Sequence, residues 1–354
     1  MSIRYVIAIL VLAGSCTVNG QESNEARKLV ASRDGSPGEA LATFINDHED
    51  DLADISVCDR DVIYGRKDGM ALTLDVYQPL RKRNRRAVIC IISAGYWSGP
   101  EYRKMPFFTS KIRFLVDRGF TVFAVIHGSQ PRYSLLEISN DVHRSVRFVR
   151  HRAQSYKIDP SHIGLFGESS GGHLALLAGF TEPAKASAVV DEVDRQSPAT
   201  QAVIAYFPNT DLINYGKENR SISDHFREQG LAMDSVFDFR KWNPSTGVFH
   251  GMSEPQRTEA LRALSPIQHV DEGDPPTLLL HGDRDRLVPI QQSQSMIDRM
   301  VEADVDCKLF VAEAQNHAWA SSVPGEERAL ADWLYQHLQI ADEQAVEREK
   351  KPSR

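Results

Sequence analysis

The sequence is poor in cysteine and in long apolar runs, and it carries no excess of positive charge. Only four of its 354 residues are cysteines, and none of them has the spacing of a zinc-binding motif, so we expect no structural metal. Lys and Arg number 41 against 48 Asp and Glu, a net charge of −7, which argues against a nucleic-acid-binding protein. With 42% hydrophobic residues and a mean hydropathy of −0.35, disordered and multi-pass membrane classes are excluded and a globular protein is expected.

The first twenty residues have the pattern of an export signal. Arg4 precedes a short apolar run at 5–14, which is followed by small and polar residues. The run is too short for a transmembrane helix, which needs about 20 apolar residues. Two processing sites remain open: residues 12–16 resemble a bacterial lipobox, which would place a lipid on Cys16, and residues 18–20 suit an ordinary signal peptidase. We expect an exported protein, periplasmic or secreted, whose only membrane attachment would be a lipid at Cys16.

The rest of the chain divides by composition into an arm, a large domain and a tail. Residues 21–55 are polar and acidic and predict a loosely held N-terminal arm, and residues 341–354 form a charged tail. The single domain between them covers residues 56–340 and contains no internal repeat. Its basic cluster at 81–86 is interpreted as a solvated turn.

Within the domain, short apolar runs alternate with amphipathic segments. Strands are predicted at 57–64, 72–76, 88–92, 121–126, 163–166, 202–206, 277–280 and 308–311, and helices at 107–118, 138–156, 174–178, 289–301 and 326–338. Such alternation predicts a mainly parallel sheet of about eight strands with helices on both faces. The turn Asp68-Gly69 predicts that the first two strands form a hairpin at one edge. Between about 207 and 264 no clear strand is seen, and we expect a cap insertion there.

The strongest chemical signal is Gly-Glu-Ser-Ser-Gly at 167–171, directly after a predicted strand and directly before a helical segment. A serine hydroxyl is a weak nucleophile unless it is presented to a base. A sharp turn from strand to helix presents it, and small residues two before and two after the serine make that turn sterically possible. The helix behind the turn favours negative charge at its N-terminus. This pattern predicts Ser169 as a nucleophile.

With this element the chain resembles the α/β-hydrolase superfamily, in particular its bacterial esterase and lipase branch of carbohydrate-esterase-like and hormone-sensitive-lipase-like serine hydrolases. The resemblance covers about 57–338, and the stretch 167–174 matches the extended form GxSxGG-x-L. It implies an α/β-hydrolase fold, Ser169 as nucleophile and the amide of Ser170 as one donor to the oxyanion. Glu168, beside the nucleophile, either lines the substrate pocket or packs under the turn.

Such a serine needs a base, and His317 falls in a loop just after the last predicted strand, where this fold delivers an imidazole to the carboxyl edge of the sheet. Three other histidines are set aside by position: His281 opens a loop, His337 lies in the last predicted helix and His173 begins the helix after the serine turn. We therefore predict His317 as the base.

The third member of a triad is an acid that holds the imidazole. The run at 281–289, His-Gly-Asp-Arg-Asp-Arg-Leu-Val-Pro, resembles the acid-bearing loop of the superfamily, which implies Asp285 in this role. Asp283 remains the alternative, and we expect it to bond the backbone of its own loop. The order serine, aspartate, histidine is the order of the superfamily.

The oxyanion loop departs from the pattern of related esterases, which carry His-Gly-Gly-Gly after the third strand. Here the equivalent stretch, 93–97, reads Ser-Ala-Gly-Tyr-Trp. Because backbone N–H groups donate to an oxyanion, side chains can change there, and the amides of Gly95 and Tyr96 are the implied donors beside Ser170. The side chains of Tyr96 and Trp97 either wall the substrate pocket or pack under the cap.

These features together predict an exported serine hydrolase that cleaves carboxylic esters through an acyl-enzyme and needs no cofactor. The hairpin and the run at 74–79 resemble carbohydrate esterases, which implies acetyl or feruloyl esters of polysaccharide as substrates. A prolyl-oligopeptidase-like peptidase stays open as an alternative, although the arm is too short for its propeller, as does a thioesterase or lactonase. A non-catalytic binding protein is disfavoured, because all three triad residues are present.

Overall fold

The computed structural model describes residues 17–18, 21–22, 52–183, 191–230, 234–317, 319 and 323–339. The predicted apolar run of the export signal, Cys16, most of the N-terminal arm and the charged tail lie outside the described residues. Within the described part, no helix combines the length and the apolar character that crossing a bilayer requires.

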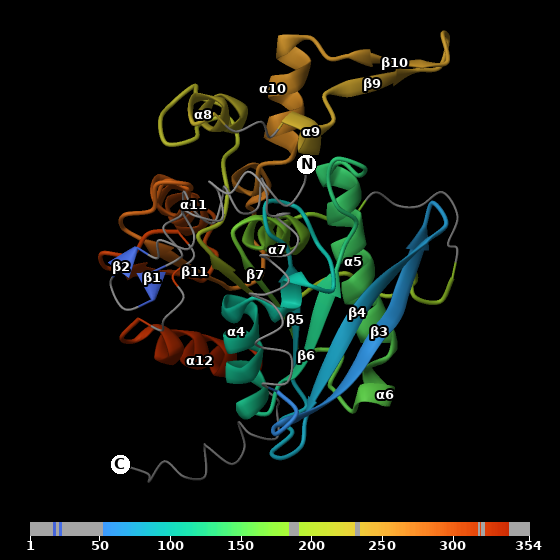
Figure 1. Ribbon diagram of the computed structural model, residues 1–354, viewed down its shortest axis with the longest axis vertical. Helices are drawn as coiled ribbons and strands as arrows, with labels where there is room; N and C mark the ends of the chain where they lie inside the picture. Colours follow the sequence, from blue (N-terminus) through green and yellow to red (C-terminus); the bar gives the residue numbers. More distant parts are fainter. Residues whose placement is uncertain are drawn as a thin grey trace.

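An eight-stranded sheet forms the centre of the molecule, with the strand order β12-β11-β8-β7-β5-β6-β4-β3 (Figure 1). The strands are β3 Ser56–Lys67, β4 Met70–Pro79, β5 Ala87–Ile92, β6 Thr121–Ile126, β7 Ile163–Glu168, β8 Ala202–Tyr206, β11 Thr277–Gly282 and β12 Cys307–Ala312. From β6 to β12 all neighbours are parallel, whereas β4 pairs antiparallel with β6 and with β3. This mainly parallel sheet confirms the predicted fold class, an α/β-hydrolase fold.

The turn between β3 and β4 explains why these two strands form a hairpin. Asp68 and Gly69 both have positive φ, of 47° and 77°, the backbone that a tight two-residue hairpin turn requires. Aspartate and glycine tolerate this conformation better than most residues. The hairpin occupies the sheet edge where the sequence predicts it.

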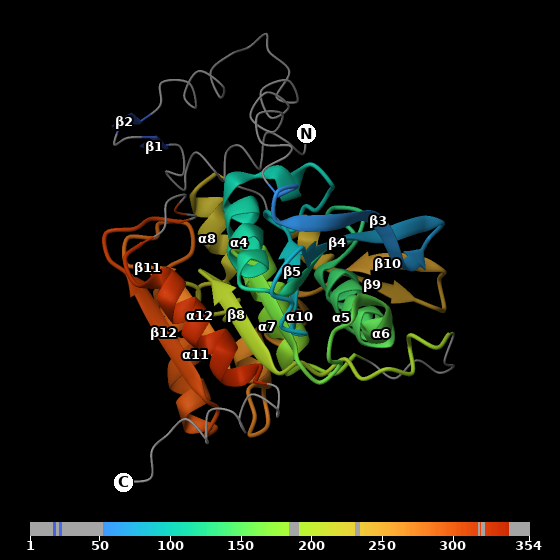
Figure 2. The same cartoon turned by 90° about the horizontal axis from the view of Figure 1, so that it is seen from below.

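Helices cover both faces of the sheet (Figures 1 and 2). Residues of α4 Pro106–Asp117 and α12 Glu326–His337 pack in the hydrophobic core on one face, and residues of α5 Leu135–His151, α7 Ser170–Phe180 and α11 Gln291–Glu302 pack in the core on the other. Strand β5 shows why both faces need covering: Ile89 and Ile91 point into one core, and Val88, Cys90 and Ile92 into the other.

The long helix predicted at 138–156 is two helices. It begins earlier, because Ser134 and Glu137 form a capping box at the start of α5, and a short helix α6, Ala153–Tyr156, follows its end at His151.

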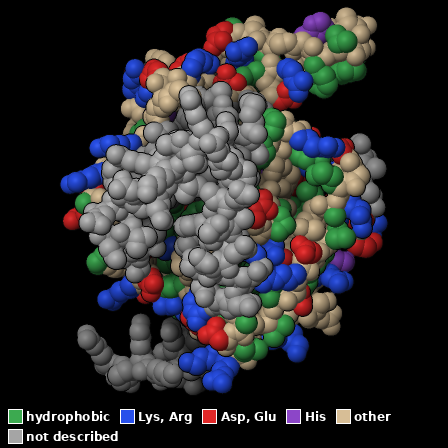
Figure 3. All heavy atoms as spheres, in the orientation of Figure 1, with side chains coloured by type: hydrophobic (Ala, Val, Ile, Leu, Met, Phe, Trp, Pro, Cys, Tyr) green, Lys and Arg blue, Asp and Glu red, His purple; other side chains and the backbone are tan. Residues whose placement is uncertain are grey.

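The cap contains α8 Ile222–Glu228, α9 Asp234–Phe237, α10 Glu254–Ala263 and a hairpin of β9 Arg240–Asn243 with β10 Val248–Gly251 (Figure 1). The expectation of no strand in this region was therefore wrong. Nearly every residue of the two strands is exposed, so the hairpin has no buried face that would leave an apolar alternation in the sequence. Trp242 and Phe249 are 50% and 55% exposed, and Figure 3 shows hydrophobic side chains at this end of the molecule.

The basic cluster at 81–86 is not solvated throughout, and in this respect the sequence interpretation was wrong. Arg86 is fully buried, and its Nε donates to the carbonyl oxygen of Leu338, just after the last helix. Burial is tolerated here because that carbonyl belongs to a helix end, where backbone oxygens lack partners within the helix.

Candidate active site

Ser169 stands on the sharp turn between β7 and α7, with φ of 52° and ψ of −117°. A serine in this region is strained, and such conformations persist where neighbouring structure holds them. Its amide donates to the carbonyl of Tyr206 at 2.9 Å. A Cβ on Gly167 would lie 2.1 Å from the carbonyl oxygen of Gly171, so the turn excludes any larger residue there. The glycines of the motif thus make the turn that lifts the hydroxyl out of the sheet.

The structure brings Ser169, His317 and Asp285 together. Nε2 of His317 lies 2.9 Å from Oγ of Ser169, and its Nδ1 lies 2.7 Å from Oδ2 of Asp285. The three residues follow the carboxyl ends of β7, β12 and β11, which meet at one edge of the parallel sheet. Since the carboxylate can only accept, Nδ1 carries the proton and Nε2 accepts the hydrogen bond of the serine hydroxyl.

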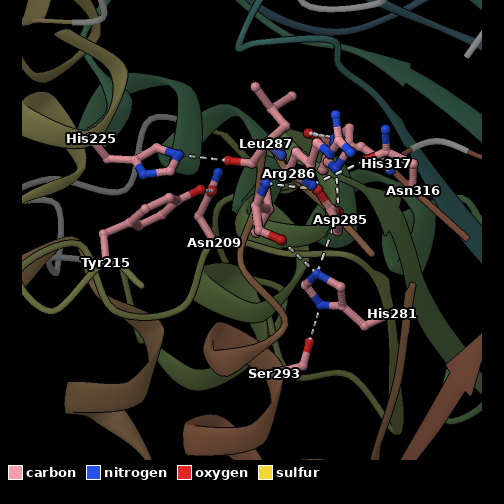
Figure 4. A network of polar contacts seen from close by, with 12 residues as sticks. Asn209, Tyr215, His225, His281, Asp285, Arg286, Leu287, Ser293, Asn316 and His317 are labelled. Atoms are coloured by element: carbon pink, nitrogen blue, oxygen red, sulfur yellow. Dashed lines mark hydrogen bonds and ion pairs between the residues drawn. The ribbon is translucent and has the colours of Figure 1, made fainter. Parts of the chain in front are cut away.

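The carboxylate of Asp285 is held from several sides (Figure 4). Its Oδ1 accepts the amides of Leu287 and Val288 at 2.9 and 2.8 Å, and Nε2 of His281 lies 3.4 Å from its Oδ2. Burial by itself raises the pKa of Asp285, but the charges and hydrogen bonds of His317 and His281 outweigh burial and hold the pKa well below its ordinary value. Asp285 is therefore an anion at neutral pH, suited to stabilise an imidazolium.

Asp283, the alternative acid, is exposed, and its backbone amide donates to the carbonyl of Ala312 at 3.2 Å. His281 is fully buried, with Nδ1 2.7 Å from Oγ of Ser293 and Nε2 2.9 Å from the carbonyl oxygen of Val288. His281 thus connects the loop that carries Asp285 to α11, and it does not contact the candidate nucleophile Ser169.

Sequence reasoning missed Asn316. This residue joins the loop after β11 that carries Asp285 (the acid loop) to the loop after β12 that carries His317 (the base loop). Its Oδ1 accepts the amide of Arg286 at 3.0 Å and that of His317 at 2.9 Å (Figure 4). Its position directly before the predicted base was the only signal for it in the sequence. The side chain keeps the histidine and the acid at a fixed separation.

Glu326 anchors the segment that follows the histidine. It is fully buried and accepts hydrogen bonds from Lys111, the Tyr206 hydroxyl at 3.0 Å, the Trp319 indole at 2.9 Å and the Val323 amide at 3.0 Å. Burial by itself raises the pKa of Glu326. The Lys111 ammonium and the hydrogen bonds from Val323 and Trp319 lower it by more, so the pKa of Glu326 lies below its ordinary value. The residue was not singled out from the sequence, where it reads as an ordinary first-turn glutamate.

Glu168 is buried beside the nucleophile within electrostatic reach of Lys111 and Glu326. Burial raises its pKa to about 8, although Lys111 opposes the shift. Among the described residues its Oε2 has no hydrogen-bond partner. Its position corresponds to the packing alternative of the sequence interpretation, beneath the turn.

The loop predicted to hold an oxyanion is a tight turn in which Ala94 and Trp97 exchange backbone hydrogen bonds of 2.9 and 3.1 Å. Gly95 and Tyr96 at its centre have φ of 58° and 65°. Within the described part of the chain, their amides and the Ser170 amide donate no hydrogen bond. These three N–H groups are therefore available to a ligand oxygen.

A serine pair ties this turn to the nucleophile's helix. Oγ of Ser93 lies 2.9 Å from Oγ of Ser170, and both side chains are buried. A Cβ on Gly171 would lie 2.8 Å from the carbonyl oxygen of Ile91, so glycine is needed where the helix meets β5.

The two aromatic side chains of the loop differ in exposure. Tyr96 is 1% exposed, and its hydroxyl contacts His173 and Asn209, which corresponds to the packing alternative of the sequence interpretation. Trp97 is half-buried against the core on the α4 face. No pattern in the sequence pointed to Asn209, which lies in the irregular segment after β8.

A family model described as BD-FAE matches residues 74–300, which include Ser169 and Asp285. "Probable isoprenylcysteine alpha-carbonyl methylesterase ICMEL1" of Oryza sativa subsp. japonica is 24% identical over 74% of this chain and 57% of its own length. "Esterase LipQ" of Mycobacterium tuberculosis is 26% identical over 79% of this chain and 62% of its own length. The chain thus spans about three fifths of these relatives, and 14% of a matching non-reducing polyketide synthase of Penicillium brasilianum.

Among solved structures, a truncated carbohydrate esterase from gut microbiota superposes with a TM-score of 0.65 over 81% of this chain and 98% of that chain, at 22% identity. At this identity the likeness concerns the fold.

Proposed function

The chain belongs to the BD-FAE family, which has the α/β-hydrolase fold, and we propose that it is a carboxylic ester hydrolase in which Ser169 forms an acyl-enzyme. The observation that carries the proposal is the chain of contacts from the Ser169 hydroxyl through both nitrogens of His317 to the buried Asp285 carboxylate. Oriented hydroxyl, imidazole and carboxylate groups are the arrangement that activates a serine.

In the first half-reaction His317 takes the proton of the Ser169 hydroxyl through Nε2, and Oγ attacks the ester carbonyl carbon. The imidazolium that results is stabilised by the Asp285 carboxylate. The carbonyl oxygen becomes an oxyanion and accepts hydrogen bonds from the amides of Gly95, Tyr96 and Ser170. As the tetrahedral intermediate collapses, the C–O bond to the alcohol breaks, and the alcohol leaves with the proton from His317.

The second half-reaction repeats these steps with water. His317 removes a proton from the water, the hydroxide attacks the acyl carbon, and the same amides hold the second oxyanion. Collapse of this intermediate releases the carboxylic acid and returns the proton to Oγ of Ser169.

For the substrate we propose acetyl or feruloyl esters of carbohydrates, hydrolysed outside the cytoplasm. The resemblance of the hairpin and of the run at 74–79 to carbohydrate esterases supports the substrate class, and the apolar run after Arg4 supports export. The mass of the mature protein recovered from the producing cell tests export: loss of about twenty residues is expected, or a lipid on Cys16, and an unprocessed chain contradicts it.

The activity is tested with p-nitrophenyl acetate and the variant Ser169→Ala. Turnover is expected to fall to background while the circular dichroism spectrum is unchanged. Ser145→Ala is the matched control, because Ser145 is also a buried serine but bonds the Val142 carbonyl within α5. Turnover that survives in Ser169→Ala would place the nucleophile elsewhere.

Acetylated xylan and methyl ferulate, assayed beside a peptide and a thioester, test the substrate class. Faster release from the carbohydrate esters is expected. Preference for the peptide would instead favour the prolyl-oligopeptidase-like alternative.

A further inference from the structure

Tyr96 holds a backbone conformation that a tyrosine rarely adopts. Its φ is 65°, and with Gly95 at 58° it forms the centre of a turn in which both middle residues have positive φ. Turns of this kind are dominated by glycine, asparagine and aspartate. A bulky residue persists in such a conformation only where surrounding contacts hold it there. The contacts that hold Tyr96 are therefore part of what shapes the turn.

The phenol of Tyr96 is fixed between two side chains. Its oxygen lies 2.7 Å from Nδ1 of His173 and 3.1 Å from Nδ2 of Asn209. Nε2 of His173 lies 2.9 Å from the carbonyl oxygen of Leu264, which can only accept, so Nε2 carries the proton. Burial lowers the pKa of His173 to about 4, so the ring is neutral at pH 7 and Nδ1 is an acceptor. The phenol consequently donates to His173 and accepts from Asn209.

The series of side-chain contacts continues from Asn209 into the cap. Oδ1 of Asn209 accepts the Tyr215 hydroxyl, and the Tyr215 ring packs on His225 with centroids 4.7 Å apart. Nε2 of His225 then donates to the carbonyl of Leu287 at 3.0 Å (Figure 4). Leu287 is the residue whose amide binds the Asp285 carboxylate. The first segment of the cap thus connects the turn at 94–97 to the acid loop.

Every polar side chain in the central part of this series of contacts is buried, and each hydrogen bond has a defined donor and a defined acceptor. Tyr96, His173, Asn209 and Tyr215 are each buried. Gln130 holds the backbone of the same turn, since its Nε2 donates to the Gly95 carbonyl and its amide to the Tyr96 carbonyl at 3.2 Å, so the phenol anchors the side chain of a turn whose carbonyls are also held. Removing one member leaves a buried donor or acceptor unpaired, which is costlier than losing an exposed bond. The turn therefore has one well-defined position relative to Ser169.

We propose that Tyr96 is a positioning residue whose phenol, held by His173 and Asn209, aims the amides of Gly95 and Tyr96 at the oxyanion formed on the Ser169 adduct. The inference rests on the proposed function. It also explains how a turn reading Ala-Gly-Tyr-Trp supplies these amides: a side-chain anchor fixes the conformation that consecutive glycines would leave free.

The test compares Tyr96→Phe with Tyr64→Phe. Tyr64 is equally buried, at 1% exposure, and its hydroxyl donates to the carbonyl of Ile126 at 3.0 Å, outside the candidate site. For each variant kcat and KM are measured with p-nitrophenyl acetate, the inhibition constant with phenylboronic acid, and Tm by circular dichroism. The boronate forms a tetrahedral adduct on a serine and so reports on the oxyanion donors.

For Tyr96→Phe we expect kcat to fall about ten- to a hundredfold, with KM within about twofold and phenylboronic acid bound more weakly by a similar factor to kcat. Tyr64→Phe is expected to lower Tm and leave kcat and boronate affinity near those of the parent. Wild-type kcat and boronate affinity in Tyr96→Phe, or equal losses in the two variants, would overturn the proposal.

Asn209→Ala provides a second route if Tyr96→Phe fails to fold. It removes the donor to the phenol but keeps the bond to His173, so we expect a smaller fall in kcat with KM unchanged. The double variant is expected to lose less than the product of the two single losses, because both act through one turn. An unchanged kcat in Asn209→Ala would contradict the proposal. Failure of the proposed function is seen separately, as turnover that survives Ser169→Ala.

Discussion

Nδ1 of His317 lies 2.7 Å from Oδ2 of Asp285, although 32 residues separate the two in the chain. The contact follows from the sheet, because β11 and β12 are parallel neighbours in which Gly282 pairs with Ala312, and the two loops leave the sheet side by side. Backbone contacts set the separation of the two loops. The distance between His317 and Asp285 therefore depends on the residues that pack between the loops as well as on these two side chains.

The two aspartates of the acid loop can be separated by substitution. Asp285→Asn is expected to lower kcat by about 10⁴, because an amide no longer fixes the histidine tautomer or stabilises an imidazolium. Asp283→Asn is expected to change kcat by less than about threefold, since Asp283 is exposed and only its backbone takes part in the loop. Kinetics with p-nitrophenyl acetate decide, and a larger loss for Asp283→Asn would reverse the assignment.

Gly282 sets how closely the acid loop approaches the base loop. A Cβ there would lie 2.4 Å from the carbonyl oxygen of Gln315, a backbone atom that cannot swing aside. Gly282→Ala is therefore expected to push the loops apart and to lower both Tm and kcat. The matched control is Gly251→Ala on the exposed hairpin, where a Cβ meets nothing within 4 Å, and which should leave both quantities unchanged. A Gly282→Ala enzyme with wild-type kcat would contradict this account of the spacing.

The buried Glu326 is expected to be essential for stability because it faces the Lys111 ammonium. Glu326→Gln leaves the largely buried Lys111 ammonium without its carboxylate, and breaking a buried pair in this way typically costs about 3–5 kcal/mol. The free energy of unfolding is measured with urea. The control is the double variant Lys111→Met with Glu326→Gln, which also removes the cation and keeps an amide oxygen as acceptor for Tyr206, Trp319 and Val323, and which should lose less than Glu326→Gln alone. Equal stability of Glu326→Gln and the parent would refute the role assigned to the pair.

Stability is expected to fall in mild acid. Burial lowers the pKa values of His127, His143 and His173 to about 4, against about 6.5 in the unfolded chain. Between these values the unfolded state binds more protons, so the free energy of unfolding falls as pH drops from about 6.5 to about 4, by up to about 1.4 kcal/mol per pH unit for each net proton. Glu168 and Asp274, with pKa values raised by burial to about 8 and about 6, act in the opposite sense, as does Asp141, whose pKa burial also raises. They are outnumbered, because burial lowers the pKa values of His225 and His337 as well.

Urea unfolding at a series of pH values checks this expectation. His143→Gln, which removes one of the three histidines without touching the candidate site, should flatten the slope below pH 6.5 by one proton's contribution. A free energy of unfolding that stays constant or rises between pH 6.5 and 4.5 would show that the acidic groups dominate.

Much of the fold could be predicted because its signals are local. The run at 88–92 is apolar at every position, as a strand buried on both faces must be, and the structure places it at β5 in the middle of the sheet. The cap hairpin could not be predicted in the same way, because its strands have no buried face, and Trp242 and Phe249 read as scattered aromatics until their pairing across the hairpin is seen.

The amino-acid sequence was enough to predict the strands of the central sheet, the order of the three candidate catalytic residues and the sharp turn at Ser169, because periodicity and the steric demands of a turn depend on a few adjacent residues. Only packing in three dimensions showed that Arg86 is buried and that Tyr96 is held by Asn209, which lies 113 residues away. Those contacts join groups that only packing brings within hydrogen-bond distance, and a hydrogen bond between distant side chains leaves no pattern in the sequence around either one.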